Sequence, residues 1–544
     1  MSYISTQLQG NHVLVWERGE DGDRNTVLYE APYYFYVDDP NGKYTTMFNT
    51  KVSKVSFNTS EEAYNARKQF TKQRLKIWES DMGPELRILS ANYYNIPAPK
   101  LTVTHLDIEV DYDPLIGFSS PKNPYAPINS CSLYHEHKKQ MAVLVVPPND
   151  SAIKWTSALL EQECNNVLEI PTNEYSTRFI ICENERELLL QLMDEIQDSD
   201  ILVGWNSLRF DFPYIAGRMV KILGKSSLRM LSFPEGNIPI LEERIIGKKS
   251  EDDESNSNFV QQTEMVLEVS GRILLDYMLL YKKYEASEKP SYKLSAISDD
   301  VLINDDGSPS LPKLEYDGSL ADLYHKNLPF FVRYNIRDTE ILHGFETKLG
   351  YVDVANQNVH LSCGQFKHVL GTLKLAELAI VNHCHHIEHK VVKNITEPEI
   401  DRSIEGALVL YPQIGMQEWI GSIDINSLYP TAIRSLNMSP EMIRGQFVEE
   451  MDACLEISKQ SDEELTMTIE KTRQKVTLTA KEWYEFLLQK KWAVSGYGTV
   501  FDQNHQGIIP AVLTDWFAQR KQYQAKKKEA ERKMSELVKK YKNG

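Results

Sequence analysis

The sequence predicts a multidomain protein of mixed α/β and α+β class that opens with a β-rich N-terminal domain. Its 544 residues are more than three times the roughly 150 residues of one compact domain. Apolar, β-prone runs at 12–16 and 33–37 precede a turn at 39–42. From residue 101 onward, strand-like runs alternate with helix-like segments, which is the pattern of an α/β domain.

The elements expected in the first half follow from this periodicity. A helix over residues 60–80 interrupts the β-rich opening. The α/β part should contain strands over 101–110, 141–146 and 201–205 and helices over 184–197 and 211–223.

The second half begins with a polar, acidic run at 250–258 between two β-like arms. This run predicts a long solvated hairpin tip, and a disordered insertion fits the same composition equally well. Beyond it we expect a helical region over 361–389, strands of a new domain over 401–411 and 419–425, and a long charged helix over 513–541.

Composition limits the class of protein. No run approaches the roughly 18 to 20 apolar residues of a membrane span, and the N-terminus lacks a signal-peptide pattern. Six cysteines without a Cys-x-x-Cys pair indicate reduced thiols. A net charge of −17 argues against a protein that simply coats nucleic acid, so DNA must bind to local basic patches such as 520–542. We expect a cytoplasmic protein with no membrane partner.

Three sequence motifs contribute carboxylates. Asp107 and Glu109 lie two residues apart in a predicted strand, so both project from one face and can share a metal ion. Asp211 follows a strand-to-helix turn, where an N-cap is the simpler role. Tyr334 and Asp338 are neighbours on one helical face. Together they match what two-metal phosphodiester hydrolysis requires, with the phenol orienting the attacking water. The alternative is unrelated surface and cap carboxylates.

In this order the motifs Asp107-x-Glu109, Asn206-x-x-x-Phe210-Asp211 and Tyr334-x-x-x-Asp338 resemble those of proofreading exonucleases of the acidic-tetrad type. The resemblance implies an RNase H-like 3′-5′ exonuclease domain. It also implies two Mg²⁺ or Mn²⁺ ions bound by the four carboxylates.

An Asp-x-x-Ser-Leu-Tyr-Pro run starting at Asp424 resembles the first palm motif of family B DNA polymerases. By that resemblance Asp424 binds both catalytic metals of a second two-ion site, and the Ile425 carbonyl holds the nucleotide-bound one. Ser427 and Leu428 would line the nucleotide site, and the ring of Tyr429 would exclude a 2′-hydroxyl. A turn aspartate and a buried core tyrosine are the structural alternatives.

Further segments extend the resemblance to family B polymerases of large tailed bacteriophages over nearly the whole chain. By this resemblance Arg520 lies near the start of the fingers helix, and it is the expected triphosphate contact because its fork pairs phosphate bidentately. Where the family commonly has a second cation, this chain has Gln524, with Lys526 and Lys527 just beyond.

The implied organisation has four parts. Residues 1–100 form the N-terminal domain, to which 348–392 return, and 101–347 form the exonuclease domain. Residues 393–504 form a partial palm and 505–544 the first part of the fingers.

A second palm aspartate and a returning fingers helix are not found in the sequence. We therefore expect a split polymerase, with a second chain that supplies the rest of palm, fingers and thumb and carries the sliding-clamp contact. Truncation would look the same. The implied substrates are primer–template DNA and dNTPs in the cytoplasm of a bacterial host. The alternatives are a stand-alone exonuclease with a vestigial palm and a non-catalytic DNA- or replisome-binding remnant.

The histidine-rich run at 383–389 contains an i, i+4 pair, His385 and His389. No nearby residue completes a ligand set, so we interpret it as a surface helix end and not as a metal site.

Overall fold

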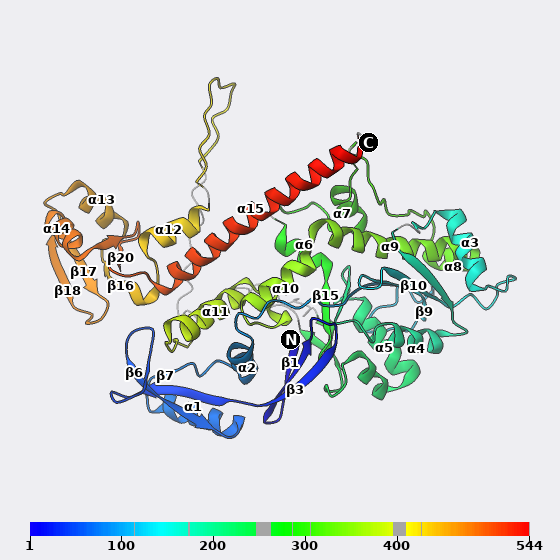
Figure 1. The fold of residues 1–544 in the computed structure, drawn as a ribbon, viewed down its shortest axis with the longest axis horizontal. Coiled ribbons are helices and arrows are strands. Elements are labelled where there is room, and N and C mark those ends of the chain that lie inside the picture. The colour runs from blue at the N-terminus through cyan, green and yellow to red at the C-terminus, as the bar shows by residue number, and fades with distance from the viewer. Residues whose placement is uncertain are drawn as a thin grey trace. The chain divides into compact units, whose positions relative to one another are not determined.

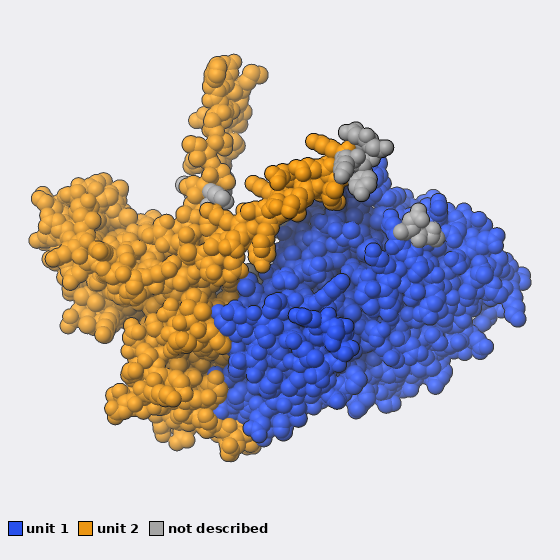
Figure 2. Space-filling model, viewed as in Figure 1, with its two compact units in different colours: residues 1–33, 83–375 blue, residues 34–82, 376–544 orange. Residues whose placement is uncertain are grey.

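A computed structural model describes residues 1–111, 113, 115–171, 174–245, 263–285, 287–304, 306–394, 410–425 and 427–542. The chain divides into two compact units (Figure 2). Unit 1 comprises 1–33 and 83–375, and unit 2 comprises 34–82 and 376–544. The finer domain boundaries expected from the sequence stay predictions. The acidic run 250–258, most of the expected strand 401–411, and Asn426 lie outside the described residues.

Unit 1 is built on a six-stranded mixed sheet with the order β11-β10-β9-β8-β12-β15. Strand β9 is antiparallel to β8 and β10, and the other neighbouring pairs are parallel. The strands are β8 (Val103–Val110), β9 (Ile128–His135), β10 (Gln140–Val145), β11 (Ser176–Ile181), β12 (Ile201–Gly204) and β15 (Ile273–Asp276).

Helices cover both faces of this sheet (Figure 1). On one face, Leu106 and Ile108 of β8 pack in the same core as residues of α4 and α5. On the other, alternate residues of β8 face α9. The helices of unit 1 include α2 (Pro84–Tyr93), α3 (Ser157–Val167), α4 (Glu185–Glu195), α5 (Asp211–Leu223), α6 (Tyr277–Tyr284), α7 (Leu294–Val301), α8 (Leu320–Lys326), α9 (Leu328–Leu349) and α10 (Tyr351–Leu361).

Two smaller sheets complete unit 1. Strands β13 (Ile240–Ile245) and β14 (Thr263–Glu268) pair as antiparallel arms, as expected. Strands β1 (Ser2–Gln9), β2 (His12–Arg18) and β3 (Arg24–Glu30) form an antiparallel sheet. That sheet is tied to the start of β12, because Arg18 and Arg24 donate to the buried carboxylate of Asp200 at 2.9 and 3.1 Å.

Unit 2 contains two further sheets. The first has the order β5-β6-β4-β7, and the second is antiparallel with the order β18-β17-β16-β20-β19 around a core that includes Phe447 and Trp483. The strands are β4 (Tyr33–Asp38), β5 (Tyr44–Thr45), β6 (Lys51–Phe57), β7 (Ile77–Trp78), β16 (Ile443–Phe447), β17 (Glu464–Ile469), β18 (Lys475–Thr479), β19 (Trp492–Val494) and β20 (Thr499–Asp502). The helices include α1 (Ser60–Lys72), α11 (Thr372–His383), which begins in unit 1, α12 (Leu428–Leu436), α13 (Met451–Lys459), α14 (Ala480–Lys490) and α15 (Ile508–Lys542).

The expected strand over 419–425 is wrong. Residues 410–425 form an extended arm without helix or strand (Figure 1), and its apolar side chains are exposed, Trp419 at 99% and Ile423 at 97%. The apolar pattern is that of a strand, but no described strand pairs with it. Leu428 then begins α12 directly, with Pro430 in its first turn, where a proline is tolerated.

The other expected elements differ mainly in their ends. The helix expected over 60–80 stops at Lys72, and the charged helix expected over 513–541 begins earlier, at Ile508. The helix expected over 211–223 is α5. Among the described helices, none combines the length and the apolar character needed to cross a membrane.

Candidate active site

Three elements bring the predicted carboxylates together at one edge of the unit 1 sheet. Strand β8 carries Asp107 and Glu109 on the face toward α9, and α9 carries Asp338. Carboxylate oxygens of these three residues lie within 4.8 Å of one another. The alternation of the strand therefore delivers both acids to the helix, as the spacing predicts.

Asp211 joins them from the start of α5. Its Oδ1 accepts the backbone N–H of Ile108 at 3.4 Å, next to both β8 acids. The N-cap of α5 is Phe210, which makes no side-chain cap, so the simpler helix-cap role does not apply. Asp211 is instead directed at the strand that carries the other ligands.

Burial and mutual repulsion make this cluster hard to ionise without a cation. Burial, then the charges of Asp338 and the other two acids, hold the pKa of Asp107 well above its usual range. Burial first, with neighbouring carboxylates adding to it, raises the pKa of Glu109 to about 8 and that of Asp211 to about 7. Burial raises the pKa of Asp338 to about 6, although Lys313 opposes this. Sites that stack carboxylates in this way are typical of metal centres.

Lys313 is a site residue that the sequence analysis missed. Its Nζ donates to Asp338 Oδ2 at 2.6 Å and lies 4.7 Å from the centre of the Tyr334 ring. The carboxylate and the phenol keep the pKa of Lys313 above its ordinary value despite burial. Lys313 lies in the loop between α7 and α8, 25 residues before Asp338, and no local spacing connects the two.

Tyr334 lies one helical turn before Asp338 and is half buried. Burial, followed by the charge of Asp338, raises the pKa of its phenol to about 12. The hydroxyl is therefore protonated at neutral pH and can donate a hydrogen bond.

A buried amide fixes the first acid. Asn335 donates from Nδ2 to Asp107 Oδ2 at 2.7 Å, and its own Oδ1 accepts the hydroxyl of Ser130 at 2.9 Å. Sequence reasoning missed Asn335 because its role depends on β8 and β9 lying under α9.

The turn between β12 and α5 is also built for close approach. A Cβ at Gly204 would lie 2.7 Å from the carbonyl oxygen of Leu106, so only glycine lets β12 lie this close to β8. Asn206 adopts a left-handed φ of 59°, which asparagine tolerates. Its N–H donates to Asp276 Oδ1 at 3.0 Å, so this buried carboxylate holds the turn that presents Asp211.

The residues of the polymerase-type motif are only partly brought together. Arg520 of α15 donates from Nη1 to the hydroxyl of Ser427 at 3.2 Å. Asp424 and Ile425 are the last two residues of the arm, and both are exposed. Leu428 and Tyr429 are exposed at the start of α12. Within the described ranges, Asp424 belongs to no cluster of three metal-binding side chains. The polymerase-site assignments remain predictions.

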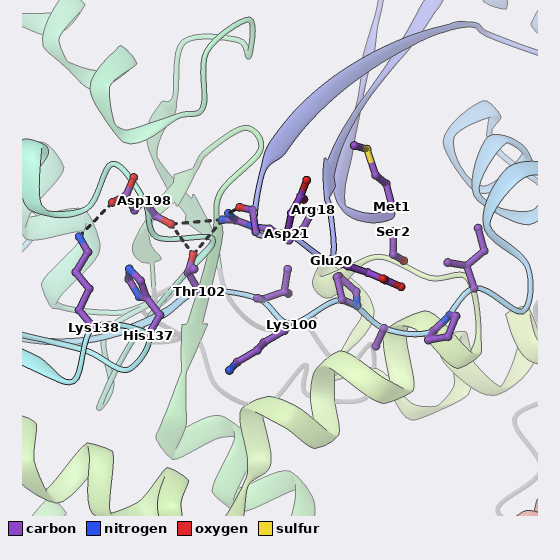
Figure 3. Close-up of a pocket in the computed structure, with 17 residues that line it drawn as sticks. Met1, Ser2, Arg18, Glu20, Asp21, Lys100, Thr102, His137, Lys138 and Asp198 are labelled. Carbon is purple, nitrogen blue, oxygen red and sulfur yellow. Dashed lines mark hydrogen bonds and ion pairs between the residues drawn. The ribbon is translucent and has the colours of Figure 1, made fainter. Parts of the chain in front are cut away.

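A cavity of about 660 Å³ lies elsewhere in unit 1 (Figure 3). Some of its polar side chains pair with one another: Lys138 donates to Asp198 at 3.1 Å, and Arg18 donates to the Thr102 hydroxyl at 3.2 Å. None of the predicted site residues lines it.

In the 383–389 run, His385 pairs with the buried Glu79 at 2.7 Å. Cys384 is buried in the small core that also contains Met47. This run joins segment 34–82 to the rest of unit 2.

Comparison with known proteins agrees with the family that the motifs resemble. The family model described as "DNA polymerase family B, exonuclease domain" matches residues 51–297. The model described as "DNA polymerase family B" matches residues 371–542. The DNA-directed DNA polymerase of Enterobacteria phage T4 is 26% identical over 99% of this chain and 55% of its own length. That of Escherichia phage RB69 is 27% identical over 64% of this chain and 36% of its own length.

A further relative is archaeal. The DNA polymerase of Pyrococcus horikoshii is 23% identical over 50% of this chain and 20% of its own length. The chain thus spans about half the length of the T4 relative. With two family descriptions that together cover most of the sequence and a T4 relative aligned along nearly all of it, this chain belongs to the family B DNA polymerases.

Proposed function

We propose that this chain removes nucleotides from the 3′ end of DNA by metal-dependent hydrolysis and contributes part of a DNA polymerase active site. One observation carries the first half of the proposal. Asp107, Glu109 and Asp338 converge from a strand and a helix, with Asp211 beside them, in a site too acidic to stay fully ionised alone.

The residues fit divalent metal ions. Carboxylate oxygens are the donors that Mg²⁺ and Mn²⁺ prefer. Asp338 Oδ1 is buried without a hydrogen-bond partner among the described residues, so a ligand atom is open toward the cluster. Asp107, Glu109, Asp211 and Asp338 would hold the ions. Two such ions, when bound, supply an activated water and steady the charge on the leaving oxygen.

The protein groups around the acids position the reactants. The protonated phenol of Tyr334 can donate to the attacking water or to a phosphate oxygen. The cation of Lys313 holds Asp338 in place and offsets negative charge that a DNA phosphate would meet. Asn335 donates a hydrogen bond to Oδ2 of Asp107 and thereby keeps the Asp107 carboxylate from rotating.

An RNase H-like fold for this domain is part of the proposal. A mixed sheet in which only the second strand of the domain, β9, runs antiparallel to its neighbours supports it.

The second half of the proposal concerns synthesis. Asp424 and the Ile425 carbonyl would hold metal, Ser427, Leu428 and Tyr429 would line the nucleotide site, and Arg520 would contact the triphosphate. The Arg520–Ser427 hydrogen bond supports a shared site. Primer–template DNA and dNTPs would be the substrates, in an infected bacterial cell. A second chain that supplies the remaining groups and the clamp contact remains a prediction; recovery of primer extension after mixing with the complementary part of a related polymerase would test it.

The hydrolytic half is tested with a 5′-labelled single-stranded oligonucleotide and Mg²⁺. The unmodified chain should shorten the oligonucleotide stepwise from its 3′ end, and the Asp107→Ala, Glu109→Ala variant should not. A Glu20→Ala, Asp21→Ala variant, which removes two exposed acids of unit 1, is the matched control. If the unmodified, folded chain leaves the DNA intact in both Mg²⁺ and Mn²⁺, the proposal is wrong and a DNA-binding remnant is favoured.

A further inference from the structure

A second cluster of metal-binding side chains lies between the same two elements as the acidic site. His105 precedes Asp107 by two residues on β8, so both project toward α9. His343 follows Asp338 by five residues on α9. Glu136, the residue after β9, lies between the two imidazoles. The cluster therefore contains nitrogen donors, whereas the acidic site contains only oxygen donors.

The distances within the cluster suit one metal ion. Glu136 Oε1 lies 2.8 Å from His105 Nε2 and 3.6 Å from His343 Nδ1, and the three ligand atoms lie within 4.8 Å of one another. Two donors about 2.0 to 2.2 Å from a tetrahedral ion lie about 3.3 to 3.6 Å apart. The His343–Glu136 separation is at that value and is too long for a good hydrogen bond. The His105–Glu136 pair, now 2.8 Å apart, would need to open by about 0.5 to 0.8 Å.

The hydrogen-bond pattern leaves donors for a cation. His343 Nε2 lies 3.5 Å from the hydroxyl of Thr347, a contact that either tautomer of the imidazole can make. In the tautomer with its proton on Nε2, the Nδ1 lone pair faces the Glu136 carboxylate at 3.6 Å, and this buried atom has no hydrogen-bond partner of normal length among the described residues. Two electron-rich atoms face each other there, an arrangement that a bound cation would stabilise.

Buried polarity and charge agree with this. The imidazole of His105 is fully buried, with its Nε2 facing the Glu136 carboxylate. Two more carboxylates act on the cluster, because Glu346 interacts electrostatically with His105 and Asp353 with Glu136. The surroundings therefore favour positive charge.

An ion could also reach the cluster. The side chains of Glu136 and His343 are 30% and 29% exposed, so the cluster opens to solvent on one side. The ring of Tyr134 lies 4.0 Å from that of His343 and fixes its orientation. A water molecule can complete the coordination from the open side.

We propose that His105, Glu136 and His343 bind one divalent ion of the zinc class, separate from the ions of the acidic site. Two imidazoles and one carboxylate form a set that binds Zn²⁺ and is poorly suited to Mg²⁺. The ion would join β8, β9 and α9 at a point next to the acids. It would thereby fix the helix that carries Asp338 against the strand that carries Asp107.

The test is isothermal titration of the chelator-treated full chain with Zn²⁺. The Asp107→Ala, Glu109→Ala variant serves as background so that the acidic site does not contribute. One equivalent should bind. His343→Ala in this background should lose that equivalent, Glu136→Gln should weaken binding at least about tenfold, and His325→Ala, which removes an exposed histidine paired with Asp150, should bind like the background.

Circular dichroism melts without metal identify any variant that does not fold, and Zn²⁺ should raise the melting temperature of the background but not of folded His343→Ala. No bound equivalent in the background, or unchanged binding by folded His343→Ala and Glu136→Gln, would overturn the proposal and leave a hydrogen-bonded His–Glu–His trio. Because the readout is binding, the result is independent of nuclease activity.

Discussion

The two carboxylate motifs of this chain lie in very different surroundings. In unit 1, Asp107 and Asp338 lie between a central strand and a buried helix, and their neighbours are fixed by hydrogen bonds. In unit 2, Asp424 belongs to the extended arm 410–425, in which the side chains of Trp419 and Ile423 are almost fully exposed.

The difference shows what a motif alone specifies. The acids of unit 1 converge because the elements that carry them share a core, which sets strand register and helix position to within a side chain. The arm has the same kind of apolar sequence but no described strand or helix against which to bury it. The spacing of residues in a motif can suggest a site, but the packing of the strands and helices that carry them determines whether the residues lie together.

The largest expected effect separates the two motifs by activity. Asp338→Ala should lower 3′ hydrolysis by about a thousandfold, because metal-borne charge stabilisation is worth several kcal/mol. Asp424→Ala should leave hydrolysis within about twofold, because the hydrolytic acids converge without it. The rates are measured on single-stranded DNA, and a large loss in Asp424→Ala would show that the two motifs form one site.

The next effect compares packing within unit 2. Trp483→Ala should destabilise the β16–β20 sheet by about 3 to 5 kcal/mol because it removes a fully buried indole. Trp419→Ala should change stability by less than about 0.5 kcal/mol, because its side chain is exposed. Hydrogen exchange of the β17 amides measures the stability change in both variants. A large loss of protection in Trp419→Ala would show that the arm packs against this sheet in solution.

Crowding the close contact between β8 and β12 should have an intermediate effect on stability. Gly204→Ala places a methyl group 2.7 Å from the Leu106 carbonyl oxygen and should cost about 1 to 3 kcal/mol together with hydrolytic activity. Gly371→Ala is the control in unit 1, since its nearest neighbour would lie 3.6 Å away. Denaturant unfolding measures both variants; equal stabilities would contradict the close approach.

Lys313→Met should reduce hydrolysis about tenfold, because the variant loses the cation that holds Asp338 and offsets charge at the acids. Lys289→Met is a closely matched control: this lysine pairs with Asp300 at 2.7 Å, and its side chain is exposed to nearly the same extent. The rate at saturating Mg²⁺ is compared. Equal rates in the two variants would remove Lys313 from the site.

The smallest effect is on stability against pH. Burial and neighbouring acids raise the pKa values of Asp338, Asp211 and Glu109 to about 6, 7 and 8. Since these lie above the unfolded values, their stabilisation is complete below about pH 4 and is lost as pH rises toward about 8. Mg²⁺ should therefore raise the melting temperature by several degrees more at about pH 8 than at about pH 5.5.

A calorimetric melt with and without Mg²⁺ at each pH measures this difference, which should shrink in the Asp107→Ala, Glu109→Ala variant. An equal Mg²⁺ effect at both pH values would mean that the acids are already ionised without metal.

Much of the acidic site could be predicted from the sequence because its signals are local. Strand alternation predicted that Asp107 and Glu109 share a face, helix spacing paired Tyr334 with Asp338, and the family inferred from the motifs is confirmed by the comparisons. Lys313 could not be found this way, because a loop brings it to α9 and no periodicity records that contact.

Other features escaped for related reasons. The His105–Glu136–His343 cluster draws on three elements, and none of the three residues stands out in its own segment. The strand expected over 419–425 failed because an apolar pattern states what a segment can bury and not whether a partner strand is present.

The link between Asp200 and the first three strands limits how unit 1 could be shortened. Asp200 is fully buried, and Arg18 and Arg24 neutralise it. A version trimmed to begin at residue 101 would lose both of these arginines and would expose the core that the first three strands share with β12 and β15. Residues 1–33 should therefore be retained, and a short linker in place of 34–82 is the more promising place to shorten the protein.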